Sequence, residues 1–259
     1  MIDKGIYKSF LSKQATREKS LAVLIDPDKC DAGKLSQAIR ASENAGVDYF
    51  FAGSSLLLRD GLDSCISFLK KHSTIPVILF PGSRFQISGK ADALLLLSLI
   101  SGRNPELLIG QHVLAAPDLK RSAMEIIPTG YMLIDGGNLT SVNYVSQTLP
   151  IPSDKADIAA STAMAGEMVG MKLIYLEAGS GAKKPVSSNM IAAVRESIGL
   201  PLIAGGGIRD AERASESSKA GADVIVIGNG FEEDTSLLFE ISCAVHEAGG
   251  LPKRKITSA

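Results

Sequence analysis

The sequence predicts an α/β protein folded as a single (β/α)8 TIM barrel. Short apolar runs alternate along the chain with amphipathic stretches, which is the pattern of repeated βα units around a parallel sheet. The length of 259 residues and the hydrophobic content of 45% fit one barrel of roughly 250 residues with a large core. Since no linker, composition break or repeat is visible, we expect residues 1–259 to form one domain.

Four apolar runs in the first half of the chain predict strands, over residues 21–25, 49–52, 76–80 and 93–100. Amphipathic stretches predict helices over residues 31–45, 61–71 and 105–116. The connection between the third and fourth strands has too little helical periodicity for a full helix. We therefore expect an irregular or strand-like replacement of the third helix.

The second half of the chain predicts four more strands. The fifth falls within residues 124–134 and is followed by a long polar loop over 135–152 and a helix over 156–169. Three further apolar runs end in glycine-rich turns, after Glu177, Ala204 and Ile227. They bring the count of strands to eight.

The turn after the sixth strand carries the strongest chemical signal. Side chains alternate along a strand, so Tyr175 and Glu177 point to one face while Leu176 packs behind them. Gly179 and Gly181 let backbone N–H groups approach an anion closely. The segment predicts a strand end that acts on a phosphorylated substrate.

Glycines after the last two strands predict a phosphate clamp. Gly206 and Gly207 follow the seventh strand, and Gly228 and Asn229 follow the eighth. The turns after strands seven and eight are where barrels of this class usually hold phosphate. The run Gly205-Gly206-Gly207 lacks the spacing of a dinucleotide fingerprint, so we expect no nicotinamide cofactor.

Composition excludes several classes of protein. The net charge is −1, whereas a nucleic-acid-binding domain normally has a basic stripe. The three cysteines are too few and too scattered for a disulfide framework or a CxxC metal site. The first residues contain no apolar signal-peptide stretch, and residues 93–100 fall far short of the ~20 needed to span a bilayer. We expect a soluble, cytoplasmic protein.

Seven motifs at predicted strand ends and turns are distributed along nearly the whole chain. They are Asp26-Pro27-Asp28-Lys29, Gly53-Ser54-Ser55, Phe80-Pro81-Gly82-Ser83, Ser101-Gly102-Arg103-Asn104-Pro105, Tyr175-Leu176-Glu177-Ala178-Gly179-Ser180-Gly181, Gly205-Gly206-Gly207-Ile208-Arg209 and Gly228-Asn229. In order and rough spacing they resemble the motifs of the geranylgeranylglyceryl phosphate synthases and their bacterial heptaprenylglyceryl phosphate synthase relatives, a family of barrel prenyltransferases. One departure is Asp135-Gly136-Gly137-Asn138, where the family pattern is Glu-Pro-Gly-Gly.

The resemblance implies a reaction in which sn-glycerol 1-phosphate attacks the first carbon of a polyprenyl diphosphate and releases diphosphate, with Mg²⁺ required. It places Mg²⁺ on Asp26 and Ser54. It places glycerol phosphate on Tyr175, Leu176, Glu177, Ala178, Gly179, Ser180, Gly181, Gly206, Gly207, Gly228 and Asn229. A homo-oligomer and a transient contact of the lipid product with a membrane surface are further expectations.

The residue chemistry is compatible with these roles. Glu177 and Tyr175 are the candidate catalytic residues, with the Glu177 carboxylate accepting the proton of the attacking hydroxyl. Asp26 is a reasonable anchor for a hard cation, since Mg²⁺ prefers oxygen ligands. Each has an ordinary alternative: Asp26 as a turn residue, Ser54 as a cap, Glu177 in an ion pair and Tyr175 as core packing.

Two other functions stay open. A sugar-phosphate isomerase could use Asp26 and Asp135 as an acid and base pair over the same clamp, but it would leave Tyr175 and Glu177 without roles. A non-catalytic phosphate-binding barrel is the second alternative. Four basic residues could contact diphosphate or face solvent: Arg103, Lys183, Lys184 and Arg209.

Overall fold

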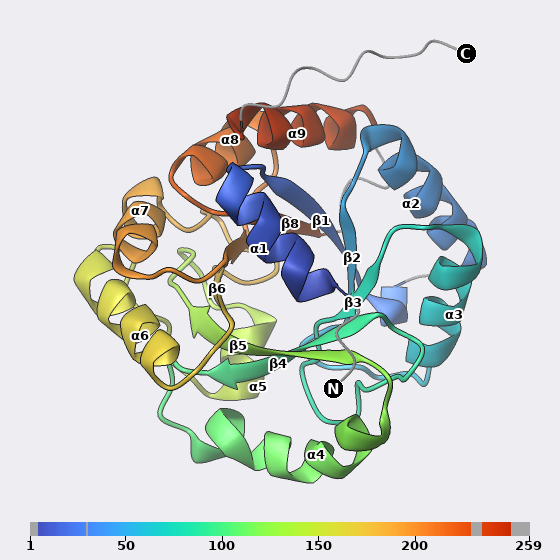
Figure 1. The fold of residues 1–259 in the computed structure, drawn as a ribbon, viewed down its shortest axis with the longest axis horizontal. Coiled ribbons are helices and arrows are strands. Elements are labelled where there is room, and N and C mark those ends of the chain that lie inside the picture. The colour runs from blue at the N-terminus through green and yellow to red at the C-terminus, as the bar shows by residue number, and fades with distance from the viewer. Residues whose placement is uncertain (1–4, 30, 229–234, 250–259) are drawn as a thin grey trace.

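The computed structural model describes residues 5–29, 31–228 and 235–249, which contain a closed barrel of eight parallel strands. The strands are β1 (Ser20–Ile25), β2 (Tyr49–Ala52), β3 (Val77–Leu79), β4 (Ala93–Leu99), β5 (Glu125–Leu133), β6 (Leu173–Glu177), β7 (Leu202–Gly205) and β8 (Val224–Gly228). Neighbours in sequence pair in order, and β8 pairs with β1 to close the sheet. The predicted barrel is confirmed (Figure 1).

Helices surround the barrel (Figure 1). They are α2 (Ala32–Ala45), α3 (Leu62–His72), α4 (Gln111–Arg121), α5 (Ser141–Ser146), α6 (Ala156–Met168), α7 (Ser188–Ser197), α8 (Ala211–Lys219) and α9 (Thr235–Ala248), with a 3-10 turn η1 (Pro27–Lys29) and a π-helix η2 (Glu106–Gly110). Residues 80–92, between β3 and β4, form only turns and bends. The prediction that the third helix is replaced by irregular chain is therefore confirmed.

An additional helix, α1 (Ile6–Thr16), lies across the amino-terminal end of the barrel (Figure 1). The sequence pattern did not predict this helix. Ile6 and Phe10 are buried, and the Phe10 ring meets the Tyr49 ring edge to face with centroids 5.1 Å apart. The carboxylate of Glu125, at the start of β5, accepts a hydrogen bond from the Ile6 N–H at 2.9 Å. This helix closes the end of the barrel opposite to the predicted site.

Two local predictions were incomplete. The polar loop predicted over residues 135–152 contains α5, because Thr140 and Asn143 form a capping box that starts a short helix. The helix predicted over 105–116 begins as η2 and continues as α4 to Arg121, despite Pro117 within it. Continuation past the proline buries the side chain of Leu119. None of the described helices is both long and apolar enough to span a membrane.

The apolar core has two parts separated by the sheet. One fills the barrel and includes Phe51, Leu95 and Tyr175, while the other lies between the sheet and the helices and includes Leu94 and Leu176. Alternate residues of β4 and β6 thus point to opposite sides, as their two-residue period requires. Tyr175 faces the interior and Leu176 faces the helices, as predicted.

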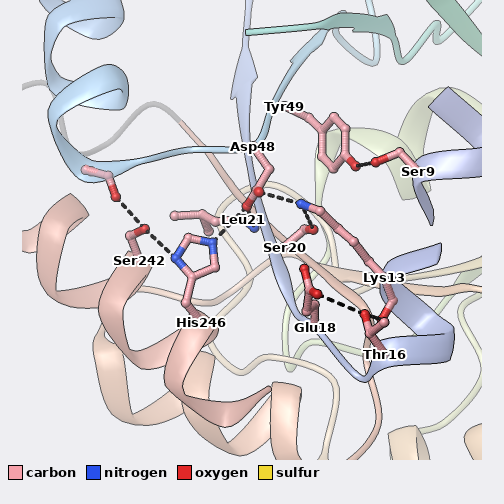
Figure 2. A network of polar contacts seen from close by, with 11 residues as sticks. Ser9, Lys13, Thr16, Glu18, Ser20, Leu21, Asp48, Tyr49, Ser242 and His246 are labelled. Atoms are coloured by element: carbon pink, nitrogen blue, oxygen red, sulfur yellow. Dashed lines mark hydrogen bonds and ion pairs between the residues drawn. The ribbon is translucent and has the colours of Figure 1, made fainter. Parts of the chain in front are cut away.

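A polar network fixes α1 and α9 to the barrel, near the amino-terminal ends of the strands (Figure 2). Asp48 accepts hydrogen bonds from Lys13 at 2.5 Å and from His246 at 2.9 Å. The Asp48 carboxyl is largely buried, which by itself raises its pKa, but the bonds from His246 and Lys13 outweigh burial and lower it. Ser242 Oγ lies 3.4 Å from His246 Nδ1, which completes a Ser-His-Asp sequence. Ser242 is fully buried and donates to a backbone carbonyl, so this arrangement is structural rather than nucleophilic.

Candidate active site

The carboxyl ends of five consecutive strands, β6, β7, β8, β1 and β2, bring the predicted site residues to one edge of the barrel. Glu177 pairs with Gly205 across β6 and β7, and Gly228 pairs with Leu24 across β8 and β1. Asp26 directly follows β1, and Ser54 lies two residues after β2. Parallel strands end at a common edge, so residues distant in sequence converge there.

Glu177 is a buried carboxyl group at this edge, with 6% of its surface exposed. Its Oε1 accepts a hydrogen bond from the Gly179 N–H at 2.6 Å. Burial raises the Glu177 pKa from 4.5 to about 7, and the Gly179 N–H and the Tyr175 hydroxyl only partly oppose this rise. A carboxyl group with this pKa can exchange a proton near neutral pH. The ion-pair alternative for Glu177 is not observed, since no cationic side chain contacts it among the described residues.

Tyr175 is completely buried, and its hydroxyl is near enough to the Glu177 carboxyl to influence the pKa of that group. It nevertheless has no partner in hydrogen-bond geometry among the described residues. Burial and the nearby Glu177 charge raise the pKa of this hydroxyl, so it remains a neutral donor. Its ring stacks on Phe80 at 5.0 Å and meets Tyr131 edge to face at 5.5 Å. A buried hydroxyl without a partner is costly unless a ligand satisfies it.

Gly205 belongs to the candidate site although the sequence pattern did not indicate it. A Cβ atom at this position would lie 2.5 Å from the Tyr175 hydroxyl oxygen. Because Gly205 has no side chain, the Tyr175 ring and hydroxyl can occupy this space. The three-glycine run was visible in the sequence, but the contact that requires its first glycine depends on the β6 and β7 register.

Gly206 and Gly207 follow in the left-handed region, with φ values of 82° and 72°. Their N–H groups have no acceptor among the described residues. Both residues are partly exposed, and Gly228 is exposed at the neighbouring strand end. Successive free N–H groups of this kind form a concave anion site. Asn229, predicted to belong to the clamp, lies outside the described residues.

Gly206 also makes room for Glu177. A Cβ atom there would lie 2.6 Å from Glu177 Oε1 and 2.6 Å from the Gly179 nitrogen. A larger residue at 206 would displace the carboxylate as well as any phosphate. Gly228 has no described atom within 4 Å of the equivalent position, so substitution there disturbs only what binds in the open space.

Leu176 and Ala178 were predicted to contact substrate. Both are buried between the sheet and the helices, facing away from the barrel interior. Any contact that they make with a ligand at this edge must come from their backbone atoms. Ser180 and Gly181 are exposed in the following turn.

Asp26 and Ser54 come together as predicted, with Ser54 Oγ 3.5 Å from Asp26 Oδ2. The Lys29 ammonium also lies 3.1 Å from that oxygen, and its side chain is 63% exposed. A carboxylate and a hydroxyl suit a hard cation that completes its coordination with water and phosphate oxygens. The described residues contain no cluster of three or more His, Cys, Asp or Glu side chains that could hold a metal alone.

The basic side chains near the site are partly occupied. Arg209 donates to the Ala182 carbonyl at 3.0 Å, and Arg103 donates to the Gly102 carbonyl at 2.8 Å. Lys183 and Lys184 are exposed, and their backbone N–H groups both bond to the Gly136 carbonyl at 3.0 Å. Arg209 therefore acts first as a brace for the turn after β6.

An apolar groove opens from this edge toward α4. Phe80 and Tyr131 form its inner wall, Leu94 and Leu96 on the outer face of β4 form its floor, and Ala115 and Leu119 of α4 cover it. Its entrance carries polar groups from the turns after β2 and β3, namely Ser54, Ser55, Ser83 and Arg84. The groove lies where a third helix would cover the sheet in a regular barrel. The sequence indicated that this helix is missing, but not that the space remains open.

Asp135, the second member of the alternative acid and base pair, closes its own turn by accepting from the Gly137 N–H at 2.8 Å. It follows β5, which is opposite β1 in the closed strand order. The two carboxylates are thus on opposite sides of the barrel, which disfavours the isomerase hypothesis.

Comparison with known proteins decides the family, because residues 13–245 match the model of the PcrB family. The chain belongs to the PcrB family. It is 55% identical over 248 residues to the geranylgeranylglyceryl phosphate synthase of Chitinophaga pinensis, covering 96% of this chain and 98% of that protein. The protein of that name from Thermococcus gammatolerans is 42% identical over 238 residues, covering 92% and 94% respectively.

A solved structure agrees with this membership. The (S)-3-O-geranylgeranylglyceryl phosphate synthase of Thermoplasma acidophilum, in complex with sn-glycerol-1-phosphate, superposes with a TM-score of 0.88 at 34% identity and covers 93% of this chain and 98% of its own. The sequence motifs of this PcrB-family protein predicted a resemblance to the geranylgeranylglyceryl phosphate synthases, and that prediction is confirmed.

Proposed function

We propose that this PcrB-family protein is a prenyltransferase that joins sn-glycerol 1-phosphate to a polyprenyl diphosphate and releases diphosphate. One observation carries the proposal. The buried Glu177 carboxyl lies beside Gly206, whose N–H and that of Gly207 have no acceptor among the described residues, and Tyr175 on the same strand face stacks on Phe80, which lines the apolar groove. An anion site, a proton acceptor and a hydrocarbon site are the three elements that this reaction requires.

The glycerol phosphate would bind at the glycine clamp. The N–H groups of Gly206 and Gly207, with the exposed end of β8 at Gly228, would hold its phosphate. Its hydroxyl would then approach Glu177 and the unpartnered Tyr175 hydroxyl. The complex of the Thermoplasma acidophilum protein with sn-glycerol-1-phosphate supports this choice of ligand.

In the reaction, a bond forms between the glycerol hydroxyl oxygen and the first carbon of the prenyl chain. The bond between that carbon and the diphosphate oxygen breaks, and diphosphate leaves with its electron pair. The hydroxyl proton passes to Glu177, whose pKa of about 7 allows it to accept and later release the proton. Positive charge developing on the allylic carbon would be stabilised by the adjacent rings of Phe80 and Tyr131.

Asp26 and Ser54 would hold Mg²⁺, since their two oxygens are of the type that this cation prefers and lie 3.5 Å apart. When bound, the cation would neutralise charge on the leaving diphosphate. Lys29, exposed beside Asp26, could turn its ammonium toward the same group.

The test of function is incubation of the protein with Mg²⁺, radiolabelled sn-glycerol 1-phosphate and a panel of prenyl diphosphates, followed by product analysis. A labelled, organic-soluble ether that depends on both substrates supports the proposal. Binding of glycerol phosphate without turnover on any prenyl diphosphate would favour the non-catalytic barrel instead.

The groove should determine which prenyl chains are accepted. Ala115→Phe would fill space between α4 and the outer face of β4, where Ala115 lines the groove. We expect the product distribution to shift to shorter chains while the affinity for glycerol phosphate stays unchanged. Competition between prenyl diphosphates of different length in one reaction measures the shift, and an unchanged distribution would place the chain elsewhere.

A homo-oligomer and a cytoplasmic location are further proposals. The first follows from the frequency with which barrels associate through helix faces. The second follows from the cysteine content, because three scattered cysteines are too few for the disulfide framework that is typical of small secreted domains.

A further inference from the structure

Two loops at the entrance of the groove expose large apolar side chains to solvent. Leu56 and Leu58, after β2, are 57% and 81% exposed, and Phe85, after β3, is 79% exposed. Leu56 directly follows Ser55 and Phe85 directly follows Arg84, both of which line the groove, and Leu58 lies two residues beyond Leu56. We refer to Leu56, Leu58 and Phe85 as the rim patch.

The rim patch is held outward by specific contacts. The Asp28 carboxylate accepts from the N–H groups of Leu58 at 2.6 Å and Arg59 at 3.1 Å, which pins the first loop. Gln86, itself 2% exposed, bonds to both the N–H and the carbonyl of Ser54 at 3.1 and 2.8 Å, which ties the two loops together. Ordered loops that present apolar tips to water are typical of surfaces that bind another apolar phase.

Charges beside the rim patch fit an anionic lipid surface. The Arg84 guanidinium lies over the Phe85 ring, 4.7 Å from its centroid, and Arg59 is exposed next to Leu58. Arginine beside an inserted aromatic or aliphatic tip can reach lipid phosphates. Asp60 and the Asp28 carboxylate, which bonds to the same loop, offset much of this charge, so the apolar tips supply most of the attraction.

We infer that the rim patch docks the protein on a lipid bilayer surface, with the groove entrance against the membrane. The inference rests on the proposed function, because a polyprenyl diphosphate is an amphiphile that partitions into bilayers. Docking in this orientation would let the prenyl chain pass from the bilayer into the groove without crossing water. The ether product could return by the same route.

The experiment is flotation of the full chain with vesicles of phosphatidylcholine, alone or mixed with phosphatidylglycerol. The test variant carries Leu58→Ser and Phe85→Ser, neither of which lines the groove. The matched control carries Met168→Ser and Val169→Ser, which are 82% and 73% exposed at the end of α6, on the amino-terminal side of the barrel. Circular dichroism verifies that both variants are folded.

We expect the wild type and the control to float with vesicles, more strongly with phosphatidylglycerol, and the test variant to bind at least about tenfold more weakly. Failure of the wild type to bind, equal binding by the test variant, or an equal loss in the control would each overturn the inference. If the wild type fails to bind vesicles and light scattering shows that only the test variant has a smaller mass, the rim patch is an interface between copies of the chain.

Turnover separates this inference from the proposed function. With geranyl diphosphate, a short substrate that stays dissolved, both variants should react at the wild-type rate. With a long-chain diphosphate presented in vesicles, the rate should fall about tenfold in the test variant alone. No turnover of either substrate by any protein would refute the proposed function while leaving the vesicle-binding result to stand by itself.

Discussion

Replacing Glu177 with glutamine should separate activity from stability. The amide has nearly the same volume as the carboxyl group and can still accept from the Gly179 N–H, but it cannot take the proton of the attacking hydroxyl. We expect Glu177→Gln to fold and to lose about 10²–10⁴-fold in kcat. The wild-type rate should fall as the pH drops below about 7, because protonation of Glu177 removes the base.

The stability effect has the opposite sign. The folded protein binds the Glu177 proton more tightly than the unfolded chain, so the free energy of unfolding falls as the pH rises from 4.5 to about 7. The difference between these two pKa values lowers the free energy of unfolding by about 3 kcal/mol at pH 8. Glu177→Gln removes this loss of stability. The gain is reduced by a weaker hydrogen bond, since a neutral amide accepts less strongly than a carboxylate from the Gly179 N–H. The variant should therefore be more stable than the wild type at pH 8 and gain little at pH 4.

Denaturant unfolding at both pH values, together with kcat and kcat/KM from pH 5 to 9, tests this reasoning. Glu125→Gln is the matched control, because Glu125 is also a buried glutamate but contacts α1 at the opposite end of the barrel. It should lower stability and leave the pH profile of the rate unchanged. Near-wild-type turnover by Glu177→Gln would remove Glu177 from the mechanism, and unchanged stability at pH 8 would refute the raised pKa.

Three further predictions address the metal, the phosphate sites and the polar network. Asp26→Asn should raise the Mg²⁺ concentration needed for turnover and weaken prenyl diphosphate binding more than glycerol phosphate binding, because an amide holds a hard cation less well than a carboxylate. Separate titrations of the two substrates check this. Equal losses of affinity for both would point to another role for Asp26. Gly228→Val should weaken glycerol phosphate binding in calorimetry while leaving diphosphate affinity intact. It is a cleaner probe than Gly206→Val, whose side chain would also clash with Glu177. The reverse pattern of affinities would mean that the two phosphate sites are assigned the wrong way round. Asp48→Asn should cost roughly 2 kcal/mol at neutral pH, because the charge is removed and one of the two oxygens that accept from Lys13 and His246 becomes an amide nitrogen, which cannot accept. The lowered Asp48 pKa stabilises the fold above about pH 4, so wild-type stability should decline as the pH falls through that range and the variant's should decline less; parallel acid curves would contradict this.

Local sequence patterns determined the order of elements and the location of the candidate catalytic groups. Apolar runs of strand length, each ending in glycine or a polar turn, predicted the barrel because burial on both faces of a parallel sheet leaves such runs continuous. The two-residue period placed Tyr175 and Glu177 on the inner face and Leu176 behind them. The missing periodicity after β3 predicted the missing helix, and the motifs at the strand ends indicated the family.

Other properties depended on contacts between segments distant in sequence. The α1 helix escaped prediction because its burial depends on the barrel end, on Tyr49 and on Glu125, rather than on a strong pattern of its own. The pKa of Glu177 and the unpartnered hydroxyl of Tyr175 follow from how completely the neighbouring strands exclude water, which no residue spacing encodes. The groove likewise exists only because α4 packs across the outer face of β4 at a distance that leaves space between them. Sequence thus determined which groups face the candidate site, whereas tertiary packing decided their ionisation, their unmet hydrogen bonds and the open space of the groove.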